Sequence, residues 1–330
     1  MSSISLCMIV KNEEATLAAC LASVADAVDE IIIVDTGSTD RTVEIAKGFT
    51  DKIFHFEWVN NFAAARNFAF SKGTKDFLMW LDADDIISRE NCRKLIELKK
   101  NLNGVDVVYM LYHYSVDESG KTLAISTRER LLRRGKDFMW SGAVHEAVDL
   151  SGFKGNFVNS DIFITHTKNL DDPTEAAALF ERNIIILERE IQSGMYTPRE
   201  MYYYAIALAS SPRRDEALPY LLKFIENPGS LKYTGFAAHL HAFNILLRQG
   251  QYNEALRIME DYEDRNKHLS EYYCTLAVFY HKLERDIPKA VAAYEKALKC
   301  TGTEPGGIKA DVQQDYYYDI PLMKLSQLSE

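Results

Sequence analysis

The sequence contains neither G-x-G-x-x-G nor G-x-x-x-x-G-K, so neither a dinucleotide-binding fold nor a P-loop is supported. Cysteine is also scarce, with five residues in 330. Their number is odd and they are scattered without metal-binding spacing: Cys7, Cys20, Cys92, Cys274 and Cys300. Such cysteines are typical of reduced thiols in a cytosolic protein.

Positive charge and long apolar runs are lacking as well. The formal net charge is −10, which argues against nucleic acid or anionic membranes as general partners. No apolar run approaches the length of a membrane span, and Ile4–Val10 leads directly into charged residues, unlike a signal peptide. We therefore expect a soluble, cytoplasmic protein without an integral membrane segment, long enough for two domains.

The first third of the chain alternates between short apolar runs and amphipathic stretches. This pattern predicts a parallel sheet with helices on both faces. The expected strands are Ile4–Val10, Glu30–Asp35, Lys52–Phe56 and Asp76–Leu81. The expected helices are Glu13–Val28, Arg41–Lys47, Phe62–Lys72 and one that follows Ser88, with Asn12, Asn61 and Ser88 as N-caps.

The fourth expected strand runs into three acids, Asp82, Asp84 and Asp85. Ligands collect at the carboxyl ends of such strands, and Mg²⁺ binds between carboxylates and substrate phosphates. If the segment stays extended, Asp82 and Asp84 face one ligand and Asp85 points elsewhere. The alternative, for this D-x-D alone, is a solvated acidic turn before a helix.

Four motifs in a fixed order carry a family resemblance: SLCMIVKNEE, EIIIVDTGSTD, NFAAARN and FLMWLDADD. Together they resemble family 2 glycosyltransferases of the GT-A fold over roughly the first half of the chain. The resemblance implies an inverting transfer from a nucleotide-sugar, usually a UDP-sugar, with Mg²⁺ or Mn²⁺ at the D-x-D.

The same resemblance assigns the donor side of the site. Val10 and Glu13 would border the uridine, and Asp35 would accept a hydrogen bond from the base or ribose. Glu13 is equally well explained by its favourable interaction with a helix dipole. Asp82 would approach the ribose or the metal, and Asp84 would bind the metal.

Arg66 lies in an otherwise apolar helix segment, where a guanidinium is expected to have a bidentate anionic partner. Either it binds the diphosphate or it supports Asp82 or Asp85, and we favour the second role. Relatives commonly carry Asp where this chain has Asn61, and Glu where it has Asp85. Both differences weaken the transfer of roles at those two positions.

A second cluster, WSGAVHE followed by FITHTK, resembles the subgroup of this family that carries helical repeats. An inverting displacement requires a base on the acceptor side, and Glu or His usually supplies it. If Val144–Val148 is extended, His145 and Glu146 face opposite ways, so we predict Glu146 as the base and His145 as the alternative.

His166 is the candidate third metal ligand, because imidazole at a carboxylate site suits Mn²⁺. A hydrogen-bonded structural histidine is an equally good interpretation of His166 taken alone. Arg130 and Arg133 are expected to form an ordinary charged face of a strand rather than a phosphate clamp.

Beyond Asp171 the sequence changes to a 3.6-residue periodicity. Three segments share a phase, with Ala217, Ala255 and Ala290 spaced 38 and 35 residues apart, near the 34 of a tetratricopeptide (TPR) repeat. We predict a GT-A domain at 1–170 and an all-α, TPR-like repeat domain at 171–330. Such repeats bind extended peptides or protein surfaces, although a scaffold or homodimer contact is the alternative.

The resemblance extends to sublancin-type peptide S-glycosyltransferases, through the ARN helix, the G-x-V-H-E segment and the repeats. It therefore implies a peptide or protein acceptor, without deciding between O-, S- and N-linkage. One rival is a cell-envelope transferase acting on a lipid-linked or lipopolysaccharide sugar. Another is a non-catalytic repeat adaptor with a degenerate transferase half.

Overall fold

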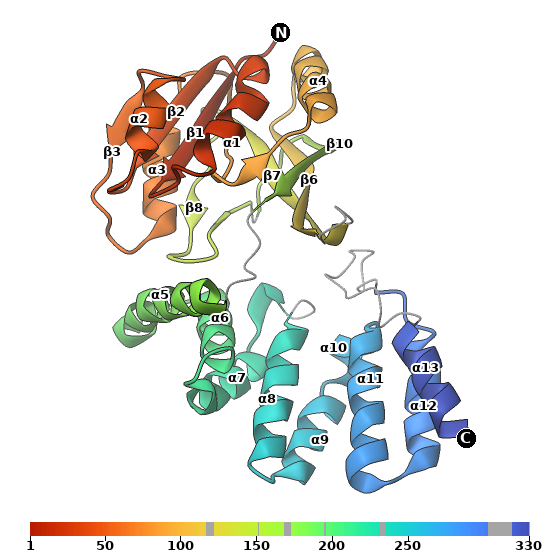
Figure 1. Ribbon diagram of the computed structural model, residues 1–330. Helices are drawn as coiled ribbons and strands as arrows, with labels where there is room; N and C mark the ends of the chain where they lie inside the picture. Colours follow the sequence, from red (N-terminus) through yellow and green to blue (C-terminus); the bar gives the residue numbers. More distant parts are fainter. Residues whose placement is uncertain are drawn as a thin grey trace. The chain divides into compact units, whose positions relative to one another are not determined.

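The computed structural model describes residues 1–116, 122–150, 152–167, 173–194, 196–231, 235–302 and 319–329 (Figure 1). The chain divides into two compact units, Met1–Leu170 and Asp171–Glu330. We call them the sheet unit and the helical unit, and each is described by itself. Within the described residues, no helix is long and apolar enough to cross a membrane.

The sheet unit is built on one large mixed sheet. Its strand order is β3-β2-β1-β4-β7-β6-β10-β5. The strands are β1 (Ile4–Val10), β2 (Glu30–Asp35), β3 (Ile53–His55), β4 (Phe77–Met79), β5 (Asp85–Ile86), β6 (Val107–Val116), β7 (Thr122–Arg133) and β10 (Phe157–His166). A separate hairpin pairs β8 (Trp140–Ser141) with β9 (Ala147–Val148).

The four strands expected from the sequence are parallel to one another, as predicted. The sheet as a whole is mixed, because β7 runs antiparallel to both β4 and β6. This arrangement brings the arginine-rich β7 beside β4, the strand that leads into the acidic segment. The carboxyl ends of β1, β2 and β4 thus share one edge of the sheet.

Helices cover both faces of the sheet, as predicted, and alternate residues of each central strand point to opposite faces. Leu6 and Ile33 pack in one apolar cluster with residues of α1 and α4, whereas Cys7 and Ile32 pack in a second cluster with residues of α3. The helices are α1 (Leu17–Val24), α2 (Thr42–Lys47), α3 (Phe62–Lys72) and α4 (Arg89–Leu98).

Two of the three expected N-caps are confirmed. Ala64 N donates to Asn61 Oδ1 at 2.8 Å, and Asn91 N donates to Ser88 Oγ at 3.3 Å. The third expectation is wrong: Asn12 has a left-handed backbone (φ 56°), and α1 starts only at Leu17. Asn12 Oδ1 instead accepts from Thr39 N at 2.8 Å, which ties the loop after β1 to the loop after β2.

The helical unit consists of helices that pack against one another in chain order. They are α5 (Pro173–Ser193), α6 (Pro198–Ala209), α7 (Leu218–Glu226), α8 (Phe236–Arg248), α9 (Tyr252–Glu260), α10 (Glu263–Asn266), α11 (Ser270–Phe279), α12 (Ile287–Ala297) and α13 (Asp319–Ser329). The linker expected before α5 lies partly outside the described residues, which resume at Pro173.

The segments that share a phase in the sequence occupy corresponding places in successive helix pairs. Ala255 lies in α9, Ala290 lies in α12, and Ala217 immediately precedes α7; none of the three is exposed. Each of these helices packs against the helix before it: α7 on α6, α9 on α8, and α12 on α11. The small side chains therefore lie where paired helices approach closely, as the repeat interpretation requires.

Candidate functional site

The acidic segment after β4 is a turn rather than an extended strand. Asp85 N donates to Asp82 O at 3.0 Å, which closes the chain around Ala83 and Asp84. Successive side chains therefore do not alternate as they would in a strand. The expectation that Asp82 and Asp84 converge while Asp85 points elsewhere is wrong, since Asp84 and Asp85 face a shared partner and Asp82 has another.

The shared partner of Asp84 and Asp85 is His166, which β10 places beside β5 by antiparallel pairing. Its Nδ1 lies 3.3 Å from Asp84 Oδ1 and 3.6 Å from Asp85 Oδ1. These two carboxylates raise the pKa of His166 to about 10. The ligand atoms of Asp84, Asp85 and His166 all lie within 4.8 Å of one another, which makes these three residues a candidate metal site.

The state of the His166 Nδ1 atom indicates whether the three side chains suit a cation. Nδ1 is buried, and nothing in the described part of the chain satisfies it with hydrogen-bond geometry. A buried polar atom left without a hydrogen bond is unusual in a folded protein. One imidazole nitrogen and carboxylate oxygens form a donor set that suits Mn²⁺, and the carboxylates suit Mg²⁺. The residues therefore fit a divalent cation.

Asp85 is the most deeply enclosed of the three acids, with no exposed surface. Its Oδ1 accepts from the Tyr112 hydroxyl at 3.0 Å, and its Oδ2 accepts from Arg130 Nη1 and from Asp82 N, each at 3.1 Å. Arg130 also donates to Trp80 O and lies 3.7 Å above the Trp80 ring.

Arg130 is fully buried, so the expectation that it belongs to an ordinary charged strand face is wrong. The central position of β7 in the sheet encloses it on both sides. Arg133 is half-buried and donates to the carbonyls of Val105 and Leu102 at 2.6 and 2.8 Å, besides lying 3.6 Å from Asp106. It serves the structure of the sheet unit and does not reach the acidic turn.

Arg66 connects the acidic turn to the β8–β9 hairpin. Its Nη2 donates to Asp82 Oδ1 at 2.7 Å, and its Nε donates to Glu146 Oε1 at 2.5 Å. The guanidinium lies about 5 Å from both the Trp80 and the Trp140 rings. Burial would lower its pKa, but the carboxylates of Asp82 and Glu146 raise it above the ordinary value.

The surrounding guanidinium groups also change the pKa of Asp82. Burial would raise the pKa of this carboxyl, but the positive charges of Arg66, Arg130 and Arg128 hold it below its ordinary value. Asp82 is therefore ionised at neutral pH. Arg66 Nη1 is buried, and the described residues offer it no hydrogen-bond partner. A cationic donor with a free N–H thus lies beside the acidic turn.

The hairpin that carries Glu146 is held against α3 by hydrogen bonds to the backbone of the hairpin. Asn67 accepts from Trp140 N at 2.8 Å and donates to Trp140 O at 3.0 Å, while Phe62 N donates to Ala143 O at 2.9 Å. Between the two strands the chain turns, so the expected extended run from Val144 to Val148 is wrong. His145 has a left-handed backbone (φ 52°) and is exposed, whereas Glu146 faces Arg66.

The predicted nucleotide residues lie at the ends of β1 and β2, where Val10 pairs with Asp35. Val10 packs its side chain into the core. Asp35 is buried, and its carboxylate accepts from Gly37 N at 3.2 Å and Ser38 N at 3.0 Å. Glu13 accepts from the Thr16 hydroxyl at 3.0 Å, and its own N–H donates to Thr42.

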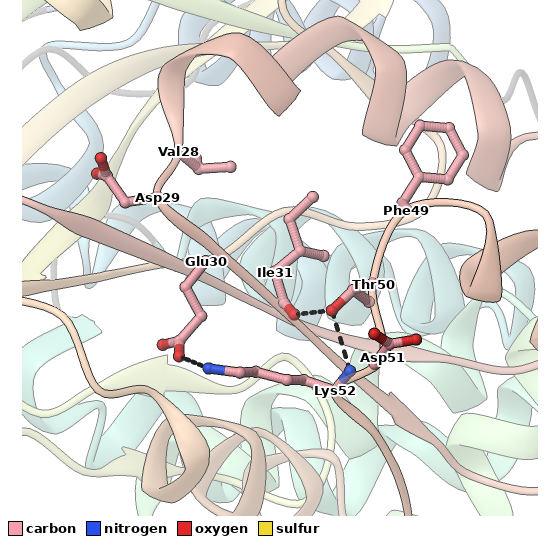
Figure 2. A pocket seen from close by; sticks show the side chains of 8 residues that line it. All are labelled: Val28, Asp29, Glu30, Ile31, Phe49, Thr50, Asp51 and Lys52. Atoms are coloured by element: carbon pink, nitrogen blue, oxygen red, sulfur yellow. Dashed lines mark hydrogen bonds and ion pairs between the residues drawn. The ribbon is translucent and has the colours of Figure 1, made fainter.

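A pocket of about 390 Å³ lies elsewhere, at the amino end of β2 (Figure 2). It is lined by Val28, Asp29, Glu30, Ile31, Phe49, Thr50, Asp51 and Lys52. Figure 2 shows the Glu30 carboxylate held by Lys52. Glu30 begins β2 and Asp35 ends it, so this pocket is separate from the acidic turn.

Several residues of the site escaped the sequence-based predictions. Tyr112 and Arg130 hold Asp85, Asn67 holds the hairpin, and Trp80 and Trp140 enclose Arg66. Nothing in the sequence signals the tryptophans around Arg66, because Trp80 and Trp140 lie 14 and 74 positions after it and only folding brings them to the guanidinium. The arginine and tyrosine contacts arise from strand order, which local sequence does not show.

The sheet places carboxylates at the carboxyl ends of β2 and β4, the edge at which α/β sheets bind their ligands. Residues 5–154 match the family model described as "Glycosyl transferase family 2". These residues form a domain of glycosyl transferase family 2, as the motifs predicted. The predicted fold class, a GT-A sheet followed by a largely helical region, is confirmed.

Two curated relatives are similar to this chain in sequence. A TPR repeat-containing protein of Synechococcus elongatus is 38% identical over 149 residues, covering 45% of this chain and 36% of that protein. The SPbeta prophage-derived glycosyltransferase SunS of Bacillus subtilis is 30% identical over 227 residues, covering 67% of this chain and 52% of SunS. The chain thus spans about a third and about half of the length of these relatives.

Among solved structures, the glucosyl-3-phosphoglycerate synthase of Mycobacterium tuberculosis, in complex with Mg²⁺ and UDP, is similar to part of this chain. The two chains are 23% identical, with a TM-score of 0.30, over 34% of this chain and 44% of that chain. The family assignment rests on the sequence matches alone.

Proposed function

We propose that this protein transfers a sugar from a UDP-sugar to a peptide or protein side chain with the help of Mg²⁺ or Mn²⁺. The observation that carries the proposal is the unsatisfied Nδ1 of His166 between the carboxylates of Asp84 and Asp85. Asp84 and His166 would hold the cation. When bound, a divalent cation stabilises the charge that develops on a departing diphosphate.

The donor would lie along the ends of β1, β2 and β4. Asp35 has two carboxylate oxygens with about four acceptor positions, of which backbone N–H groups occupy two. The remaining positions suit a hydrogen bond from a base or a ribose. Val10 and Glu13 would border the uridine, Val10 through its backbone because its side chain packs in the core.

Arg66 would orient the two carboxylates that the reaction uses. It holds Asp82 on the donor side and Glu146 on the acceptor side, and its free Nη1–H suits a phosphate oxygen. This arrangement combines the two roles considered for Arg66. The buried, paired guanidinium keeps both side chains in place before any substrate arrives.

Glu146 would act as the base of an inverting displacement that moves a hexosyl or N-acetylhexosaminyl group. Arg66 occupies its Oε1, and among the described residues nothing donates to Oε2. Oε2 is thus the atom that can take a proton from the acceptor. His145 is the alternative base, being exposed at the turn of the same hairpin.

The helical unit supports a peptide or protein acceptor, because stacked helix pairs suit extended chains. Similarity to a TPR repeat-containing protein supports the repeat interpretation of the helices, and similarity to the glycosyltransferase SunS supports sugar transfer. The linkage stays open between O-, S- and N-glycosides. A cytoplasmic location agrees with the five free cysteines. A homodimer formed through the helical unit is the alternative role of the helices.

Two rival functions make different predictions. A cell-envelope transferase would be expected to present a basic or amphipathic surface, which a net charge of −10 does not favour. A non-catalytic adaptor would have no reason to retain Asp35, Asp82, Asp84 and Glu146 together. Hydrolysis of a UDP-sugar distinguishes the enzyme from the adaptor.

Calorimetry with UDP tests the proposed function. We expect UDP to bind in the presence of Mn²⁺, to bind much more weakly with a chelator, and to lose its dependence on metal in Asp84→Asn. The matched control is Asp51→Asn, an exposed aspartate at the pocket beyond the amino end of β2. UDP binding that ignores both chelator and Asp84→Asn contradicts the metal assignment.

A further inference from the structure

We infer that Asp85 is a positioning residue and not a metal ligand. Together with Arg130 and Tyr112 it forms what we call the Asp85 anchor, which fixes the acidic turn and His166 from behind. Asp84 and His166 are then the protein ligands of the cation. This inference rests on the proposed function and narrows the three residues grouped above to two.

The hydrogen bonds of Asp85 support the inference first. An ionised carboxylate offers about four acceptor positions. Tyr112 OH, Arg130 Nη1 and Asp82 N already occupy three of them, at distances of 3.0, 3.1 and 3.1 Å. The bond from Asp82 N closes the acidic turn on itself, so the carboxylate of Asp85 determines where Asp84 lies.

The balance of charge points the same way. Arg130 and Asp85 are both fully buried, and the ion pair between them is the only one that Arg130 makes among the described residues. Arg130 therefore neutralises the negative charge of Asp85, and the carboxylate attracts a metal cation less strongly as a result. Asp84 has no such partner: within the described chain its only ion-pair contact is with His166.

Asp84 and Asp85 also differ in the solvent exposure of their side chains. The side chains of Asp84 and His166 are 13% and 25% exposed, whereas that of Asp85 is 0% exposed. A cation that joins the protein to the phosphates of a donor must lie on the side that the donor can reach. That side carries Asp84 and His166, while Asp85 lies behind them.

Asp85 could serve a cation through more than the single position left on its Oδ1, which lies 3.6 Å from His166 Nδ1, only by giving up one of its donors. Releasing Arg130 would leave a buried guanidinium without a counter-charge, and its Nε and Nη2 already have no partner among the described residues. Releasing Tyr112 would leave a buried hydroxyl unsatisfied. Both changes are unfavourable, so the anchor keeps its hydrogen bonds when the cation binds.

The direct test is an anomalous-difference map from crystals of the full chain grown with Mn²⁺ and UDP. We expect the Mn²⁺ peak to lie within bonding distance of Asp84 and His166 and outside bonding distance of both Asp85 oxygens. A Mn–O bond to Asp85 overturns the inference. A structure that binds UDP without any Mn²⁺ overturns the metal part of the proposed function instead, and the inference with it.

Solution measurements give a second test, with electron paramagnetic resonance reporting free Mn²⁺ in the presence of UDP. Asp84→Asn should weaken Mn²⁺ binding by more than about 100-fold, beyond the usual 10–100-fold cost of losing a residue that only supports a ligand. Asp85→Asn leaves Arg130 uncompensated and risks unfolding, so Asp85→Asn/Arg130→Met, which removes both charges, is the informative variant.

The paired variant should fold, as judged by its thermal melt, and bind Mn²⁺ about 10–100-fold more weakly than the unchanged protein, because the ligands remain but lose their support. Tyr112→Phe should weaken Mn²⁺ binding in the same direction but by less. If the folded paired variant loses as much affinity for Mn²⁺ as Asp84→Asn, Asp85 is a ligand and the inference is wrong.

Discussion

Arg66 Nε and Glu146 Oε1 lie 2.5 Å apart although 80 positions separate the two residues in the chain. The contact joins α3 to the β8–β9 hairpin, and the same guanidinium reaches Asp82 in the acidic turn. One buried arginine thereby sets the distance between the proposed donor and acceptor sides.

Replacing Arg66 by methionine should destabilise the fold and the site together. The substitution leaves the carboxylates of Asp82 and Glu146 without the guanidinium that pairs with them. We expect the free energy of unfolding to fall by roughly 3 kcal/mol, because breaking a buried ion pair costs this much or more. Denaturant titration measures it. Arg93→Met, which removes an exposed arginine on α4, should change the free energy by less than about 0.5 kcal/mol.

The same arginine allows a test of its coupling to Glu146. The double variant Arg66→Met/Glu146→Gln should be more stable than the sum of the single effects predicts, by about 1–3 kcal/mol, because the residues are in contact. Additive effects would mean that the two side chains do not interact in solution as they do in the structure.

Glu146→Gln separates a base from a binding residue. It keeps the shape and the hydrogen bond to Arg66 but cannot take a proton at neutral pH. We expect the transfer rate to fall by about 10²–10⁴-fold while UDP affinity stays nearly unchanged. If Glu146→Gln remains active and His145→Ala is inactive, His145 is the base. A thiol acceptor would reduce the loss, because thiolates form readily near neutral pH.

Glu30 should make the sheet unit less stable at acidic pH. Burial would raise the pKa of this carboxyl, but hydrogen bonds from Lys52, Ser5 and Thr74 lower it from 4.5 to about 2. A lowered pKa gives stability that is complete above pH 4.5 and is lost as the pH falls through about 2.

Unfolding free energies measured between neutral pH and pH 2 check this effect. Glu30→Gln should remove up to about 3 kcal/mol at neutral pH, since one pKa unit corresponds to about 1.4 kcal/mol. It should also flatten the fall in stability below pH 4.5. A variant with the same acid dependence as the unchanged protein would show that the Glu30 contacts do not hold in solution.

A chain ending at Leu170 tests what the helices contribute. The proposed donor residues all precede this point, so the shortened protein should bind UDP and slowly hydrolyse a UDP-sugar, yet lose transfer to its acceptor. Ordering an extended peptide costs entropy that a preformed surface offsets. A thermal melt must first show that the shortened chain folds. Equal transfer by a folded shortened chain would mean that the helices are only a scaffold.

The fold could be predicted further than the site, for physical reasons. Strands β1 to β4 and the N-caps Asn61 and Ser88 depend on neighbours a few positions away, and they were predicted correctly. Asn12 failed because a contact with the loop after β2 sets its backbone. Arg130 failed because its partner lies 45 positions away and strand order brings the two together.

The acidic segment shows the limit most clearly. The sequence predicted that carboxylates gather at the end of β4 and that His166 belongs near Asp84, and the structure places these two 3.3 Å apart. It could not predict that a backbone bond from Asp85 to Asp82 turns the chain, because period-two alternation assumes an extended strand. Which acid faces which partner depends on that turn.

The most direct test of the whole account is the release of UDP from a panel of UDP-sugars, with candidate acceptor peptides analysed by mass spectrometry in the same reactions. With Mn²⁺, the unchanged protein should release UDP from at least one sugar donor and add that sugar's mass to a peptide. A chelator or Asp84→Asn should suppress both signals, whereas Asp51→Asn should leave them intact. Release of UDP that is equally fast with chelator and in Asp84→Asn, or no consumption of any UDP-sugar, would contradict the account.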